Sequence, residues 1–163
     1  MALTERTALE NGRSLDPIDR RILALLQDNA KRSQAEVAKA VGLTAPSVNE
    51  RIRKLERAGY IRGYVALLDD RKLGHDITAF VEVFVEHPKY EAAFIAAVSA
   101  LDEVLECHHI TGEFSLLLKV KVTDMAAFRR LLIESLNTIR GVRQTRTVIV
   151  LSTSKEQHRI KVA

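Results

Sequence analysis

The sequence predicts an α+β protein in two parts: an N-terminal helix-turn-helix domain of winged-helix type and a C-terminal ferredoxin-like βαββαβ sandwich. Three short amphipathic segments with helix-start and helix-stop residues fill residues 16–59 and predict the first part. Two similar strand–helix–strand patterns follow in tandem and predict the second. The charge also separates the parts, because residues 1–65 hold 12 Lys and Arg against 8 Asp and Glu, whereas the rest holds 13 of each. A basic first part indicates a polyanionic partner; a mildly basic solvated surface is the alternative.

The composition bounds the class of protein. Of the 163 residues, 47% are hydrophobic, which is enough for the cores of two small domains. No run approaches the ~18 apolar residues of a membrane span, and the polar residues 1–14 do not resemble a secretory signal. The single cysteine, Cys107, excludes an intrachain disulfide and fits a reducing compartment. We therefore expect a cytoplasmic protein with no membrane partner.

The first two helices are predicted from their ends. Asp16 followed by Pro17 is a typical helix start, and apolar residues at helical spacing follow it. Ser33 with Glu36 three residues later has the spacing of a capping box, and Gly42 is a typical helix stop. A short turn after this glycine leads into a third helix, which completes a helix-turn-helix.

The third helix, from near Ala45 to about Ala58, is the predicted DNA-reading helix. Val48, Ile52 and Leu55 fall within a narrow arc and are expected to face the core. In a helix-turn-helix, the second helix enters the major groove with its N-terminal residues on the base edges. The opposite face starts polar and becomes basic, which favours base contacts early and phosphate contacts late. The predicted DNA contacts are Thr44, Ser47, Asn49, Glu50, Arg51, Arg53, Lys54 and Arg57.

Two features of this helix leave alternatives open. Glu50 opposes phosphates, so it either accepts from a cytosine amino group or pairs with Lys54 one turn later. The whole segment also fits an ordinary amphipathic helix with a solvated basic face. The coincidence of turn, phase and charge favours DNA.

A strand is expected at residues 60–68, leading away from the helix-turn-helix. The second part is predicted as four strands, at 77–86, 104–110, 115–122 and 142–152, and two helices, at 89–101 and 124–139. The sandwich strands are apolar on both faces, since Phe80, Phe84 and Leu117 alternate with an equally apolar set. The second face therefore needs a cover, for which a second copy of the chain is the simplest choice. A homodimer would read a palindromic site in double-stranded DNA; cover by the N-terminal strand region is the alternative.

The domain boundaries follow from these elements. We expect a flexible arm over residues 1–14, the helix-turn-helix domain over 15–65, a linker over 66–76 and the sandwich over 77–155. A frayed tail is expected over 156–163.

Several motifs resemble the Lrp/AsnC (feast/famine) regulators. They are Leu15–Leu23, Ala35–Ala38, Val41–Thr44, Arg51–Glu56 running into Gly59–Ile61, Thr111–Glu113 before a strand, and Gly141–Thr147. The similarity covers about residues 15–155. It implies a helix-turn-helix domain joined to a sensor domain that dimerises and assembles further into octamers. The resemblance also implies an amino-acid effector, bound near the glycine loop at a contact between dimers.

Carried over residue by residue, the resemblance implies an effector site at one loop and one strand. Its residues would be Thr111, Gly112, Glu113, Phe114, Ser115, Thr145 and Thr147. His109, just before the loop, is added from its position in the sequence. The family often has an acidic residue where this chain has Ser115, so the resemblance leaves the identity of the effector open.

Other chemistries find less support. Cys107 and His109 share a strand face, but two ligands do not make a zinc site, so we expect no metal and no cofactor. No catalytic triad, P-loop or dinucleotide-binding glycine motif is present, so no catalytic residue is predicted. Two alternatives stay open: an enzyme resembling siroheme decarboxylases on the same scaffold, and an amino-acid-binding module whose helix-turn-helix serves only assembly.

Overall fold

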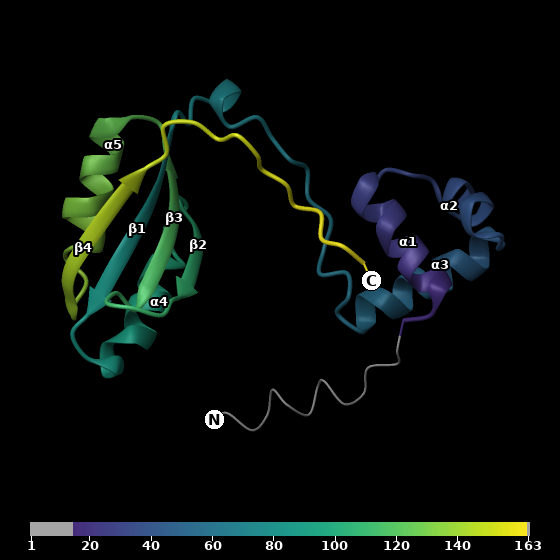
Figure 1. Cartoon of the computed structure of the whole chain (residues 1–163), viewed down its shortest axis with the longest axis horizontal. Helices are drawn as coiled ribbons and strands as arrows, with labels where there is room; N and C mark the ends of the chain where they lie inside the picture. Colours follow the sequence, from purple (N-terminus) through teal and green to yellow (C-terminus); the bar gives the residue numbers. More distant parts are fainter. Residues whose placement is uncertain (1–14, 163) are drawn as a thin grey trace. The chain divides into compact units, whose positions relative to one another are not determined.

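The computed structural model describes residues 15–162, so the predicted arm over residues 1–14 lies outside the described part (Figure 1). The chain divides into two compact units. The helical unit comprises residues 15–67 together with 156–162, and the sheet unit comprises Leu68–Lys155. Between residues 15 and 162, no helix has the length and apolar character needed to cross a bilayer.

The helical unit contains the three predicted helices, α1 (Pro17–Asp28), α2 (Gln34–Val41) and α3 (Ala45–Arg57). Each begins as predicted, because Asp16, Ser33 and Thr44 accept hydrogen bonds from backbone N–H groups of the first turn. Gly42 ends α2 in the left-handed conformation, at φ 70°. The core residues of this unit are Ile22, Leu23, Val37, Ala38, Val48 and Leu55.

The strand predicted at residues 60–68 is absent. This segment runs on from α3 without entering any ladder of the described chain, although its alternating apolar residues fit a strand pattern. Val65, Leu67 and Leu68 are 69% to 83% exposed. The pattern failed because a strand needs a neighbouring strand, and residues 15–162 provide none beside this segment.

The sheet unit has the predicted ferredoxin-like topology. Its four strands are β1 (Ile77–Val85), β2 (Val104–His109), β3 (Leu116–Val122) and β4 (Val142–Ile149). They form one antiparallel sheet in the order β2-β3-β1-β4 (Figure 1). Two strand–helix–strand units interleaved in this way place β1 and β3 at the centre of the sheet.

The helices of this unit are shorter or less regular than predicted. The first consists of a 3₁₀ turn, η2 (Pro88–Tyr90), followed by α4 (Glu91–Val98). The second begins as α5 (Met125–Arg130) and continues as a π-helical segment, η3 (Leu131–Leu136). Their apolar residues cover one face of the sheet, and that core comprises Ala79, Val81, Val83, Val85, Phe94, Val98, Leu116, Leu118, Val120, Val122, Phe128, Leu131 and Leu136.

The other face of the sheet carries no element of the sheet unit. We call it the open face; it presents Phe80, Phe84, Leu117 and Val148 between charged side chains. Phe80, Phe84 and Leu117 are only half-buried, whereas their strand neighbours on the helical side are fully buried. The apolar residues predicted for the second face therefore do lie there, but they share it with charged residues such as Glu82, Lys119 and Arg146.

The tail predicted to fray is instead docked. Residues 156–162 return to the helical unit, where Val162 packs against its core and Ile160 exchanges two hydrogen bonds with Gln27 (Figure 1). Fraying was predicted because the segment ends the chain, whereas its contacts join residues that are distant in sequence.

Gly141 occupies a position that only glycine fits. Its φ is 94°, and a Cβ built there would lie 2.5 Å from the Cβ of Tyr90. Gly74 has a similar φ of 82° but open space around it.

Gly141→Ala should therefore destabilise the protein by about 1–3 kcal/mol more than Gly74→Ala. Both variants carry the backbone strain, but only the new methyl group at position 141 would overlap the Tyr90 side chain. Urea unfolding followed by circular dichroism measures this difference; equal losses would contradict the packing assignment.

Candidate functional site

One charged side chain ties α3 to the start of α1, in addition to the apolar packing of the helix. Arg51 reaches from α3 to the start of α1, where its Nη1 lies 2.5 Å from Asp16 Oδ2 and 2.7 Å from Asp19 Oδ1. Asp16 is at the same time the N-cap of α1. The basic pattern of α3 predicts Arg51 as a phosphate contact, but its guanidinium has two carboxylate partners inside the unit, so we assign it to positioning α3.

The ionisation of this cluster follows its contacts. The Asp19 backbone N–H, and next the Arg51 guanidinium, lower the pKa of Asp16. The same two carboxylates raise the pKa of Arg51 further above its ordinary value. Asp16 and Arg51 therefore form a charged pair at neutral pH, and Asp19 is the second carboxylate in contact with the same guanidinium.

The start of α3 presents short polar side chains. Asn49 and Ser47 are partly exposed, and the Asn49 side-chain oxygen accepts a hydrogen bond of 3.1 Å from the Gln34 amide on α2. Thr44 is occupied as the N-cap, accepting from the Ser47 N–H at 3.4 Å. Gln34 was not predicted from the sequence; its proximity to Asn49 arises from the packing of α2 against α3. Ser47 and the Asn49–Gln34 pair form a polar patch of donors and acceptors suited to base edges.

The end of α3 is basic and exposed. Glu50 lies 3.7 Å from Lys54 and 3.5 Å from Arg57, so the predicted alternative of an i+4 pair with Lys54 is confirmed. Arg53 has no ion-pair partner among the described residues. All three cations are exposed, and such surface pairs are weak enough for phosphate to replace the carboxylate.

The predicted effector loop joins β2 to β3. The Ile110 N–H donates to the Ser115 carbonyl at 3.0 Å and closes the loop, while Gly112 at φ 121° makes its tip. Thr111, Gly112 and Glu113 are exposed. The Ser115 hydroxyl accepts a 3.4 Å hydrogen bond from the Val85 N–H, so this side chain extends the ladder of β1 rather than pointing to solvent.

Phe114 connects this loop to β4. Its ring is buried, and the Arg146 guanidinium lies over it at 4.9 Å from the ring centroid. Arg146 also binds Glu82 on β1 through two nitrogens, one of them at 2.8 Å. Glu82 foremost, and Glu113 to a lesser extent, raise the pKa of Arg146. Neither Arg146 nor Glu82 was predicted, because pairing across strands distant in sequence is not visible in a linear pattern.

The remaining predicted effector residues lie apart from this contact. Thr145 and Thr147 face the helical side of β4, opposite to Arg146, and the Thr145 hydroxyl donates to Asn137 at 3.3 Å. His109 ends β2 with its Nε2 3.6 Å from a Glu91 carboxylate oxygen. Within one chain, the structure therefore joins Phe114 to β4 but does not gather all the predicted residues into one pocket.

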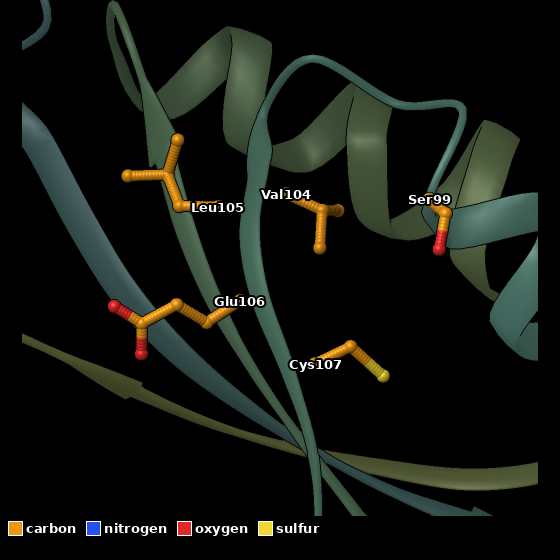
Figure 2. Close-up of a pocket in the computed structure, with 5 residues that line it drawn as sticks. All are labelled: Ser99, Val104, Leu105, Glu106 and Cys107. Atoms are coloured by element: carbon orange, nitrogen blue, oxygen red, sulfur yellow. The ribbon is translucent and has the colours of Figure 1, made fainter. Parts of the chain in front are cut away.

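A shallow pocket of about 230 Å³ lies elsewhere, at the start of β2 (Figure 2). Figure 2 shows Leu105 and Glu106 on one side of the strand and Cys107 on the other. Burial raises the pKa of the Cys107 thiol, which disfavours the nucleophilic thiolate. Across residues 15–162, no three His, Cys, Asp or Glu side chains are placed to hold a metal ion.

Comparison with known families matches both units. A model of a winged helix-turn-helix DNA-binding domain matches residues 15–62, and a model of the Lrp/AsnC ligand binding domain matches residues 78–160.

Curated relatives match nearly the whole chain. The leucine-responsive regulatory proteins of Salmonella typhimurium and Escherichia coli K12 are each 42% identical over 153 residues, which cover 93% of both chains. These relatives are regulatory proteins rather than enzymes, so the enzymatic alternative is set aside.

Solved structures match the fold. Escherichia coli AsnC superposes with a TM-score of 0.85 at 32% identity, over 91% of this chain and 99% of that one. A Neisseria meningitidis transcriptional regulator solved in complex with L-Met superposes with a TM-score of 0.84 at 32% identity, over 89% and 95%.

Replacing Arg51 and replacing Arg53 should affect stability and DNA binding in different ways. Arg51→Ala should lower the thermal midpoint of unfolding and leave the salt dependence of DNA binding unchanged, because it removes a contact inside the unit. Arg53→Ala should keep the midpoint and reduce the slope of log K against log salt by about 1, because it removes one phosphate contact.

The Asp16 carboxylate stabilises the fold fully above its ordinary pKa of 3.8, and this contribution is lost as the pH falls through the lowered folded-state value. Arg51→Ala should accordingly lose less stability on acidification than the wild type; an unchanged midpoint together with a flatter salt slope would restore Arg51 to the DNA surface.

Proposed function

Since the chain belongs to the Lrp/AsnC family of DNA-binding transcription regulators, we propose that it binds a two-fold DNA site as a dimer under the control of an amino-acid effector. The observation that supports this most is the division of the outer face of α3 into a polar start and a basic end. The protein would act in the cytoplasm, where its DNA is.

Direct reading of bases falls to the start of α3. Ser47 and Asn49 are short, partly exposed and placed in the first two turns of the helix, the part that meets base edges in this motif. The hydrogen bond from Gln34 holds the Asn49 oxygen and leaves the Asn49 amide N–H groups for an acceptor on a base. Thr44 supports this end as the cap of the helix.

Phosphate contacts fall to the end of α3. Arg53, Lys54 and Arg57 carry three positive charges against the single negative charge of Glu50. On binding, Lys54 and Arg57 would exchange Glu50 for phosphate oxygens, and Glu50 would become available to a cytosine amino group. Arg51 takes no part in this surface, because Asp16 and Asp19 hold it.

Dimerisation follows from the open face of the sheet. Phe80, Phe84 and Leu117 are half-buried on a face that no element of the sheet unit covers. Two ion pairs already join charged residues across its strands, Glu82 with Arg146 and Glu106 with Lys119. A partner that covers this face would therefore leave few charges buried without a counter-charge. A second copy presents the same pattern, and two-fold dimers are the commonest closed assembly. Octamers, implied by the resemblance, stay a prediction.

An amino acid is the proposed effector, bound at the loop from Thr111 to Ser115. The exposed loop backbone offers N–H groups to a carboxylate. The similar Neisseria meningitidis regulator was solved with L-Met. Because the Ser115 hydroxyl is directed to the Val85 N–H, the amino group of the effector would need a carboxylate from elsewhere, such as Glu113. Within one chain the predicted effector residues are not gathered at one place, which favours a site between copies.

The DNA contacts are tested by Arg53→Ala with Lys54→Ala. We expect DNA affinity to fall at least about tenfold and the salt slope to decrease by about 2, because two phosphate contacts are lost. Fluorescence anisotropy across a salt series measures both. Arg129→Ala with Arg130→Ala, on the exposed side of α5, is the matched control with the same change of charge. Equal affinity of the two double variants would contradict the assignment.

The dimer is tested by sedimentation equilibrium. The wild type should sediment as a dimer or larger at micromolar concentration, and Leu117→Asp should shift it to the monomer by placing a charge on the open face. Met125→Asp, on the exposed side of α5, should leave the assembly unchanged. A monomeric wild type would refute the dimer.

The effector is tested by thermal shift against the twenty amino acids. At a concentration of ~100 Kd, a bound amino acid stabilises the folded state by about 2.7 kcal/mol and raises the midpoint accordingly. Gly112→Ala should lose the response, whereas Gly74→Ala, equally strained but far from the loop in sequence, should keep it. If no amino acid shifts the wild type, the protein is an effector-independent regulator.

A further inference from the structure

The last residues of the chain form a specific contact with α1. The Gln27 side-chain amide donates to the Ile160 carbonyl at 3.1 Å, and the Ile160 N–H donates to the Gln27 side-chain oxygen at 2.9 Å. One side chain thus pairs with both backbone groups of one residue, as a neighbouring strand would. The Ile160 side chain is 77% exposed, so the contact recognises the backbone and not that side chain.

Two further contacts flank this rung. Arg159 Nη1 lies 3.1 Å from an Asp28 carboxylate oxygen at the end of α1. Val162 is partly buried against the core of the helical unit, the core that also holds Val48 and Leu55 of α3. The segment therefore touches α1 by polar contacts and the shared core of the three helices by an apolar one.

The path of the chain makes this docked segment a second covalent connection between the two units. The chain leaves the helical unit after Leu67, builds the sheet unit, and re-enters the helical unit at Glu156. The second crossing comes directly from β4, with only residues 150–155 between Ile149 and the helical unit. β4 carries Arg146, which binds Phe114 of the predicted effector loop.

We propose that residues 156–162 are a strap that links the DNA-binding helices to β4 and transmits the state of the sensor directly to them. The inference rests on the proposed function for the nature of the signal, while the docking itself does not. A helical unit held by one flexible linker can reorient without cost to the sheet unit, and then the two sites are uncoupled. A second connection restricts that freedom, so a change in β4 alters the conformations open to the helices.

Coupling between two sites is reciprocal, so the strap can be tested from the DNA side. The disrupting variant combines Gln27→Ala with Val162→Asp, which removes the rung and the apolar contact. Ile160→Ser is the matched control, because it alters the same segment at a side chain that the contact does not use. Circular dichroism establishes that each variant is folded. The DNA probe is a duplex selected for binding to the wild type from a random library.

Hydrogen exchange by mass spectrometry on the full chain gives the first readout. The amide of residue 160, whose N–H donates to Gln27, should exchange at least about tenfold more slowly in the wild type and in Ile160→Ser than in the disrupting variant. Equal exchange in all three would show that the strap is not docked in solution and would overturn the proposal.

Exchange in β4 gives the second readout. DNA binding should change the exchange of residues 142–149 in the wild type and in Ile160→Ser, and not in the disrupting variant. No change in the wild type, or the same change in the disrupting variant, would overturn transmission through the strap. If no amino acid binds, the effector proposal fails while this readout still decides the strap. If the wild type selects no duplex, the DNA proposal fails. The strap is then tested by the change of exchange in α3 when the amino acid is added.

Discussion

The ion-pair cluster of Arg51 with Asp16 and Asp19 is the constraint on which the DNA-binding surface depends. α3 buries Val48 and Leu55 and packs Ile52 against the same core, which sets the side of the helix that faces inward. A guanidinium held by two carboxylates at the start of α1 adds a directional contact to that packing, because its planar donors accept few geometries. With Arg51 turned toward α1, Asn49 and Arg53 are turned outward.

In the sheet unit the corresponding constraint is the unequal cover of the two sheet faces. Helices bury the face of Val81 and Leu118 completely, whereas the face of Phe80 and Leu117 keeps apolar surface in contact with solvent. The charges on the open face are neutralised within the sheet, since Arg146 binds Glu82 and stacks on Phe114. The same pair thus prepares one face for a second copy and ties the effector loop to β4.

The sequence was a good guide where local chemistry decides the structure. The caps at Asp16, Ser33 and Thr44 located three helices to within a residue or two, because a cap is a contact between close neighbours. It failed where a distant partner decides. Residues 60–68 have a strand pattern without a partner strand, and residues 156–162 lack a pattern but have a partner in Gln27. Arg51 is a residue type that often binds phosphate, but here it binds two carboxylates inside the helical unit. Only the packing of α1 against α3 reveals this difference.

The central claim, that the outer face of α3 lies in the major groove in a two-fold complex, is tested most directly by tethered cleavage of DNA. An iron chelate attached at Ser47→Cys, in a Cys107→Ala background that removes the single native cysteine, cleaves nearby sugars when hydroxyl radicals are generated. We expect two symmetric clusters of cleavage, spaced by a multiple of about 10.5 base pairs, and none from the same chelate at Met125→Cys. Uniform cleavage, or the same pattern from both positions, would contradict it.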